Sequence, residues 1–160
     1  MPTRRSQFDA LSAVYSRFIG ELKSCGHPSA LWMAESLEQS NSKMSEWLSD
    51  PTSGITRSKL AAGMKQGLRD FPLGLRDYPK PVGPRLMSAL RTIIQEEAPD
   101  LLADEREKLS RILKRGRVRN EDEFYLVRHR VDEIEGHAEH QSELAGLLKL
   151  LDEFEAGPRR

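Results

Sequence analysis

The chain has 160 residues, 38% hydrophobic and 31% charged, and its 25 basic and 25 acidic side chains give a net charge of zero. This length fits one domain or two small ones, and a neutral total excludes a general attraction to polyanions. The single cysteine, Cys25, excludes an intrachain disulfide, and no cysteine–histidine spacing of a zinc site occurs. Neither a signal peptide nor a run of about 18 apolar residues is present, so we expect a cytoplasmic chain without a membrane span.

The charges are unevenly spread along the chain. Residues 1–54 hold 5 basic and 6 acidic side chains, residues 55–91 hold 8 and 2, and residues 92–160 hold 12 and 17. This distribution indicates either a match between the basic middle and the acidic C-terminal third, within a chain or between chains, or a local basic patch. Leucine occurs 21 times and valine 5 times, which favours helices because β-branched residues suit strands better.

Three helices are predicted in an N-terminal part, residues 1–70. The first follows the N-cap Ser6 and ends at Gly26. The second opens at Pro28, carries Leu31, Trp32 and Leu37, and is expected to be interrupted by the serine-rich residues 40–45. After a turn at residues 50–54 comes the third, residues 55–70, whose two glycines indicate either a weakened helix or the close approach of another helix.

Residues 71–84 contain four prolines and two glycines, which predicts an irregular loop or linker. Basic and aromatic side chains alternate around it, a pattern that suits an anion or single-stranded nucleic acid. The alternative is a rigid connector between two helical halves, and no glycine-rich phosphate-binding motif is present. The candidate residues for this loop site are Arg69, Arg76, Tyr78, Lys80 and Arg85.

Four further helices are predicted in a C-terminal part, residues 85–156, followed by a frayed tail at residues 157–160. Their apolar residues recur at helical spacing, and no strand pair with turn chemistry is present. We therefore predict an all-α fold, a bundle of about six or seven amphipathic helices with short antiparallel connections. All these segments also fit within a single domain.

The segment KRGRVRNEDEFYLVRHR, residues 114–130, joins two of these helices. Gly116 has the position of a helix-ending residue, and Asn120 with Glu123 has the spacing of a capping box. Val118 is the one apolar residue of the turn, so we expect it to be buried there. Most of the charge pattern is therefore explained as a structural corner between helices.

Six residues of this segment are not explained by helix ends. The arginines suit phosphate contacts, although three neighbouring carboxylates argue against a nucleic-acid interface. Two aromatic or apolar groups lie beside them, and at helical spacing Leu126 falls on the polar face. We interpret the set as a partner surface: Arg117, Arg119, Tyr125, Leu126, Arg128 and Arg130.

The same helix carries the candidate metal ligands of the chain. If that helix continues past residue 136, then His129, Glu133, His137 and His140 lie on one face opposite the apolar residues. His129 and His137 are two turns apart, so only His137 and His140, with Glu133, form a close set. The alternative is a solvated face, and we predict neither a metal nor a cofactor.

No catalytic constellation is found, so we expect a non-enzymatic, small soluble helical protein that mediates protein–protein interaction or assembly. The expected partner is the chain itself or another protein, and the expected oligomer surface is the helix pair at residues 120–135 and 140–154. The alternative is a nucleic-acid-associated regulator that uses the basic region 55–91.

Overall fold

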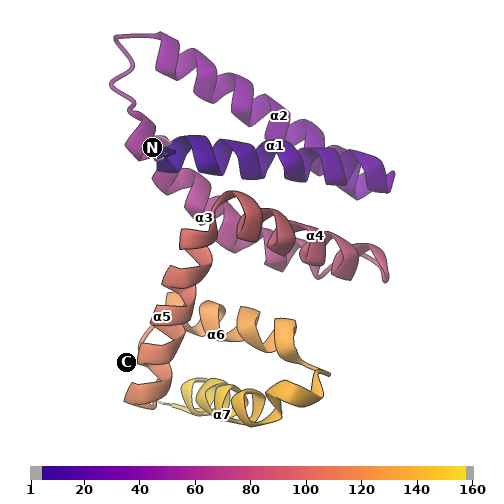
Figure 1. Cartoon of the computed structure of the whole chain (residues 1–160), viewed down its shortest axis with the longest axis vertical. Helices are drawn as coiled ribbons and strands as arrows, with labels where there is room; N and C mark the ends of the chain where they lie inside the picture. The colour runs from indigo at the N-terminus through magenta and orange to yellow at the C-terminus, as the bar shows by residue number, and fades with distance from the viewer. Residues whose placement is uncertain (1–4, 158–160) are drawn as a thin grey trace. The chain divides into compact units, whose positions relative to one another are not determined.

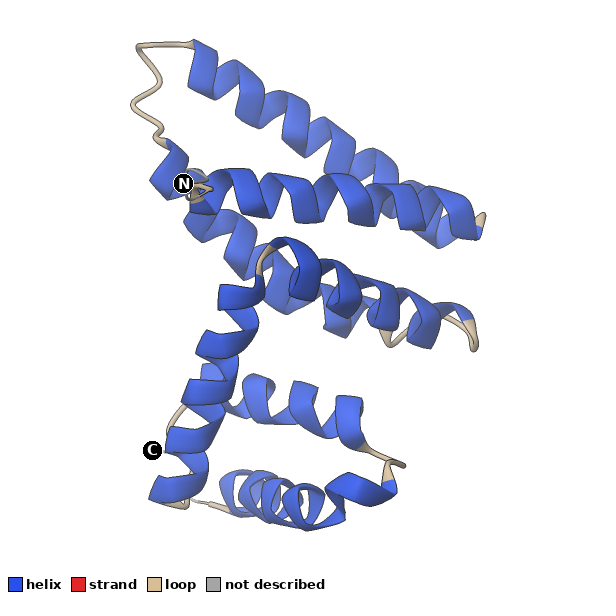
Figure 2. Cartoon of the chain, viewed as in Figure 1, coloured by secondary structure: helices blue, strands red, loops and turns tan. Residues whose placement is uncertain are grey.

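The computed structural model describes residues 5–157 of the chain. This part contains seven α-helices, one short 3₁₀ helix and no strand, which confirms the predicted all-α class (Figure 2). No helix in this part is long and apolar enough to cross a membrane. The helices are α1 (Gln7–Cys25), α2 (Pro28–Ser49), α3 (Arg57–Leu75), α4 (Val82–Glu97), α5 (Pro99–Arg115), α6 (Glu121–Ile134), η1 (Ala138–His140) and α7 (Gln141–Ala156).

The chain divides into two compact units, Met1–Pro99 and Asp100–Arg160. In the first unit, α1 packs against α2, α3 and α4, and α3 packs against α4 (Figure 1). The six buried residues of α1 recur at helical spacing and form the centre of this unit. They are Leu11, Val14, Tyr15, Phe18, Ile19 and Leu22.

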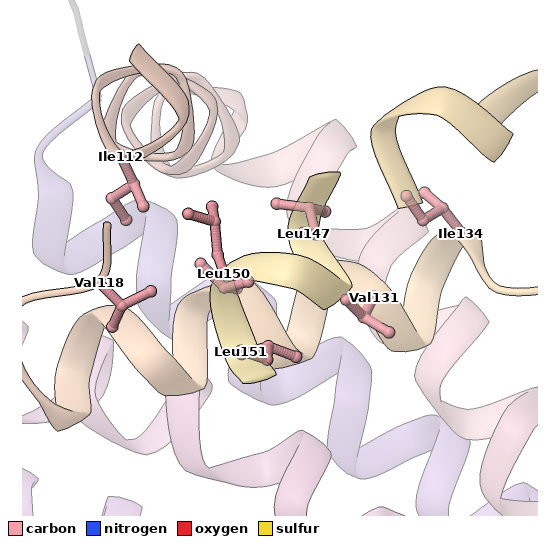
Figure 3. Close-up of a cluster of buried hydrophobic side chains, with 8 residues drawn as sticks. Ile112, Val118, Val131, Ile134, Leu147, Leu150 and Leu151 are labelled. Atoms are coloured by element: carbon pink, nitrogen blue, oxygen red, sulfur yellow. The ribbon is translucent and has the colours of Figure 1, made fainter. Parts of the chain in front are cut away.

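The second unit is formed by α5, α6, η1 and α7 around a separate hydrophobic core. Figure 3 shows side chains of this core, which come from three helices and from the turn before α6. Val118 is buried in it, as expected for the apolar residue of that turn. The buried members are Ile112, Val118, Val127, Val131, Ile134, Leu147, Leu150 and Leu151.

The predicted helix ends are confirmed at both termini of α1 and at the start of α6. The Ser6 hydroxyl accepts a hydrogen bond from the Asp9 amide at 3.1 Å, and Gly26 has a positive φ of 70°. Asn120 Oδ1 accepts from the Glu123 amide at 2.9 Å, while Glu123 Oε2 accepts from the Arg119 amide at 2.8 Å. Local side-chain chemistry therefore fixes where these helices begin and end.

The prediction of an irregular stretch at residues 71–84 is wrong. Helix α3 continues to Leu75 although Pro72 lies inside it, and α4 starts at Val82, so only residues 76–81 are irregular. Pro72 cannot donate to the carbonyl of Leu68, but Pro72 and Leu75 are buried, and packing stabilises the helix past this defect. Pro84 lies in the first turn of α4, where an N–H has no intrahelical partner.

Two other expectations for helix boundaries are also wrong. Helix α2 is continuous through residues 40–45, because serines on an exposed face weaken a helix only slightly. Helix α6 ends at Ile134, and Gly136 takes a positive φ of 86°, so the continuous histidine-bearing helix does not exist. Of the predicted frayed tail, residues 158–160 lie outside the described residues.

Candidate partner-binding surfaces

The corner between α5 and α6 is held by an ion pair and hydrogen bonds. Gly116 has a positive φ of 79° after the end of α5. The Arg115 guanidinium pairs with the Glu123 carboxylate and donates from Nη2 to the Arg117 carbonyl at 2.9 Å. Because Glu123 also accepts from the Arg119 amide just before the N-cap, Arg115 and Glu123 tie the end of one helix to the start of the next.

The structure separates the six predicted partner residues into two groups. Tyr125 is 48% exposed, and the side chains of Arg117 and Arg119 are exposed without a hydrogen bond or ion pair to any described residue. Leu126 is half-buried and packs against the core of the second unit, so its assignment to a polar face is corrected. It lies at the edge of the buried stripe of α6 rather than opposite that stripe.

The other two arginines take part in ion pairs. Arg128 Nε lies 3.9 Å from Asp132 one turn further along α6. Arg130 donates from Nε and Nη2 to the two carboxylate oxygens of Glu143 on α7, at 2.8 and 3.2 Å. Its Nη1 donates to Glu133 at 3.2 Å. Arg130 therefore links α6 to α7 through a bidentate pair.

This pair shifts the protonation of both partners. The hydrogen bonds from Arg130 lower the pKa of Glu143 below its usual value, although partial burial opposes the shift. The hydrogen bond to Glu143 likewise raises the pKa of Arg130. Both groups therefore stay charged across the physiological pH range, and the link between α6 and α7 remains intact there.

The metal candidates are dispersed by the break after Ile134. The Glu133 carboxylate accepts from Arg130 and lies 3.1 Å from Nε2 of His129. The rings of His137 and His140 have centroids 6.5 Å apart, and His140 Nδ1 lies 3.5 Å from Glu143. Within residues 5–157, no three histidine, cysteine or acidic side chains form a group that could hold a metal ion.

The candidate loop residues lie around the connection between α3 and α4. The Tyr78 ring stacks on His27 at 5.7 Å, and its hydroxyl donates to the Ser29 carbonyl at 3.0 Å. Burial, with a smaller effect of Cys25, raises the pKa of this hydroxyl. Tyr78 therefore packs on the start of α2. The side chains of Arg69, Arg76, Lys80 and Arg85 are exposed, and Arg76 has a partner of its own within the chain.

The N-terminus of α4, beside Lys80 and Arg85, does not offer a free anion site. The amides of Val82 and Gly83 both donate to the Pro79 carbonyl, at 2.8 and 3.2 Å, and Pro84 has no N–H. An anion bound there would have to displace these bonds. The basic side chains near this loop are therefore surface charges rather than parts of a phosphate cradle.

An exposed apolar face on α2 was not singled out from the sequence. In its first two turns the helix buries Ala30 and Ala34, while Leu31 is 45% exposed and Trp32 is 70% exposed. At about 100° per residue, Trp32 lies roughly 180° around the axis from the two alanines. The sequence contains a heptad-like series of positions on α2, and in the structure all of them are buried or half-buried: Ala30, Ala34, Leu37, Asn41, Met44 and Leu48. The spacing of this series could have indicated which side of α2 is buried.

The second half of α2 packs less closely. Residues 35–49 include no fully buried side chain, and in Figure 1 this half of α2 diverges from α1. Its exposed acidic groups lie on the side of Leu31 and Trp32. We call Leu31, Trp32, Glu35 and Glu38 the α2 outer face.

No family model, curated protein or solved structure matches this chain.

Proposed function

We propose that this chain is a small helical interaction protein that assembles with copies of itself. The observation that carries the proposal is the inverted arrangement of α2, which buries two alanines and exposes a leucine and a tryptophan in the same two turns. Exposing a tryptophan side chain to water is unfavourable, and tryptophan is enriched among the residues that dominate binding energy at protein interfaces. A surface of this kind gains free energy when another chain covers it.

The C-terminal helix pair at residues 120–135 and 140–154 is a second proposed contact surface. Tyr125 and Leu148 are exposed on α6 and α7, and Arg117 and Arg119 lie free at the corner before them. A tyrosine with nearby arginines is a composition found at the centre of interfaces. The ion pair from Arg130 to Glu143 supports this surface by fixing α6 against α7.

Sedimentation velocity of the full chain over a series of micromolar concentrations tests the proposal. We expect the weight-average sedimentation coefficient to rise with concentration as copies associate. The Tyr125→Ala variant measures the share of the C-terminal surface, because an exposed side chain can be removed with little effect on folding. A monomer at every concentration would contradict the proposed function.

A nucleic-acid-associated role is the second candidate. It is favoured by Arg69, Lys80 and Arg85, whose exposed side chains have no ion pair with any residue in the described part. Fluorescence anisotropy of a labelled single-stranded oligonucleotide at low salt tests it, with Arg69→Glu/Arg85→Glu as the comparison. Binding that weakens steeply with salt and is lost in the variant is the expected result for this role. Absence of binding at low salt excludes it.

A further inference from the structure

The outer surface of α3 carries basic side chains, whereas the charged residues of the α2 outer face are acidic. Lys65, Arg69 and Leu73 follow one another at intervals of four residues, so they lie along one side of the helix. Arg69 is exposed, Leu73 is 39% exposed, and Lys65 is half-buried. We call these three residues the α3 outer face.

The two faces also match in spacing. On α2, Glu35 lies four residues after Leu31, and Glu38 lies three residues further. On α3, read in the opposite direction, Arg69 lies four residues before Leu73, and Lys65 lies four residues before Arg69. An antiparallel pair of helices would therefore place apolar groups against apolar groups and both carboxylates against cations.

Three of the four charges that would meet have no partner among the described residues. Glu35, Arg69 and Lys65 form no hydrogen bond or ion pair with any residue between 5 and 157, while Glu38 pairs with Lys23 on α1. Helix α2 as a whole has three glutamates and one lysine, and α3 has four basic residues and one aspartate. Complementary charge favours the correct register and disfavours pairing of like faces.

Within one copy the two faces do not cover each other. Helix α2 directs Met33 towards α3, since a Cβ placed on Gly74 would lie 3.8 Å from the Met33 methyl group. Leu31, Trp32 and Leu73 all remain exposed. The two faces are therefore not partners of each other within one copy.

We propose that the α2 outer face of one copy packs antiparallel on the α3 outer face of a second copy, with Glu35 opposite Arg69 and Trp32 beside Leu73. This proposal rests on the proposed self-association and names the surfaces that carry it. The contact is head-to-tail, so each copy retains one free face and assembly continues into a chain or closes into a ring. Because one pair of helix faces is smaller than a standard interface, the association is reversible and depends on concentration.

The test uses single charge reversals in the full chain, Glu35→Arg and Arg69→Glu, measured by sedimentation velocity. Each variant alone is expected to associate about 5-fold more weakly than the unmodified chain, because each places like charges opposite one another. Trp32→Ala is expected to weaken association about 30-fold. Thermal melting followed by circular dichroism checks that these exposed substitutions leave the fold intact.

Mixing the Glu35→Arg and Arg69→Glu variants in equal amounts gives the decisive measurement. Two kinds of contact can then form between unlike copies. One joins the two substituted side chains, whose charges are exchanged but still opposite. The other joins the original Glu35 of one copy to the original Arg69 of the other. Each such contact should be as strong as in the unmodified chain, so the mixture should associate more strongly than either variant alone. Arg85→Glu is the matched control, because it reverses an exposed arginine on α4 that belongs to neither face.

Three results would overturn the pairing while leaving the proposed self-association in place. These are variants that associate like the unmodified chain, a mixture no stronger than its components, and an Arg85→Glu control weakened as much as Arg69→Glu. A chain that is monomeric at all concentrations would overturn both the pairing and the proposed function.

Discussion

The Tyr15 hydroxyl lies against Gly67, where helix α3 has no side chain. It donates to the Met64 carbonyl at 2.7 Å, and a Cβ added at Gly67 would overlap its oxygen. We expect Gly67→Ala to lower the free energy of unfolding by about 2 kcal/mol, because the hydroxyl must move and its buried bond is lost. Chemical denaturation monitored by circular dichroism measures this change.

Gly63, one turn earlier in α3, provides the matched control. A Cβ there meets nothing within 4 Å, so Gly63→Ala should stabilise the protein by up to about 1 kcal/mol through helix propensity. In a Tyr15→Phe background the cost of Gly67→Ala should shrink, because the overlapping oxygen is gone. Equal effects of the two alanine substitutions would show that Tyr15 does not set the packing at Gly67.

The same tyrosine predicts a change of stability at alkaline pH. Burial, with a smaller effect of Asp70, raises the pKa of Tyr15 from 10.0 to about 12. The stabilisation is therefore fully present below pH 10 and is lost as the pH rises from 10 towards 12. Absorbance titration of the tyrosines should show an ionisation near pH 12 that is absent from Tyr15→Phe and separate from that of Tyr78, whose pKa is also raised. A variant titrating like the unmodified chain would refute the assignment.

The pair between Arg130 and Glu143 predicts a change of stability in acid. The pKa of Glu143 is lowered from its usual 4.5, so the stabilisation is present above pH 4.5 and is lost as the pH falls through the lower folded-state pKa. We expect Glu143→Gln to cost about 1 kcal/mol at neutral pH and nothing below the folded-state pKa. Denaturation at several pH values measures both limits.

A control for that pair is the exposed ion pair of Arg111 with Glu107 on α5, whose side chains are 70% and 61% exposed. Glu107→Gln should change stability by no more than about 0.5 kcal/mol, because exposed pairs contribute little. If Glu107→Gln and Glu143→Gln had equal effects at neutral pH, the link between α6 and α7 would not contribute to stability.

The N-cap residue Asn120 is expected to stabilise the first turn of α6. Replacing it by alanine removes the acceptor of the Glu123 amide and should cost about 1 kcal/mol, whereas Asn120→Asp should preserve the cap. Amide hydrogen exchange should show faster exchange in the first turn of α6 for Asn120→Ala only. Unchanged protection in that variant would argue against the capping role.

The helix ends were predictable from the sequence because they depend on neighbouring residues. Ser6, Gly26, Asn120 and Glu123 act within four positions of the groups they satisfy. The burial of Val118 was predictable because it is the one apolar residue in a polar turn. The fold class followed from helical spacing of leucines, which requires no knowledge of distant contacts.

The course of α3 was not predictable in this way. Pro72 alone predicts a helix end, but the ring of Phe71 packs at 5.5 Å from Tyr15 and at 5.4 Å from Phe18, contacts between residues far apart in the chain. The outward direction of Trp32 was missed for a related reason. Alanine does not stand out as a core residue in a sequence, although Ala30 and Ala34 are the buried residues of α2.

The central position of α1 has a consequence for folding during synthesis. This helix leaves the ribosome before α2, α3 and α4, yet it packs against all three. Its last neighbour, α4, ends about 70 residues after α1 does, and at about 5–20 residues per second those residues take several seconds to synthesise. Throughout that interval the apolar side of α1 is incompletely covered, so the nascent first unit exposes apolar surface until α4 emerges.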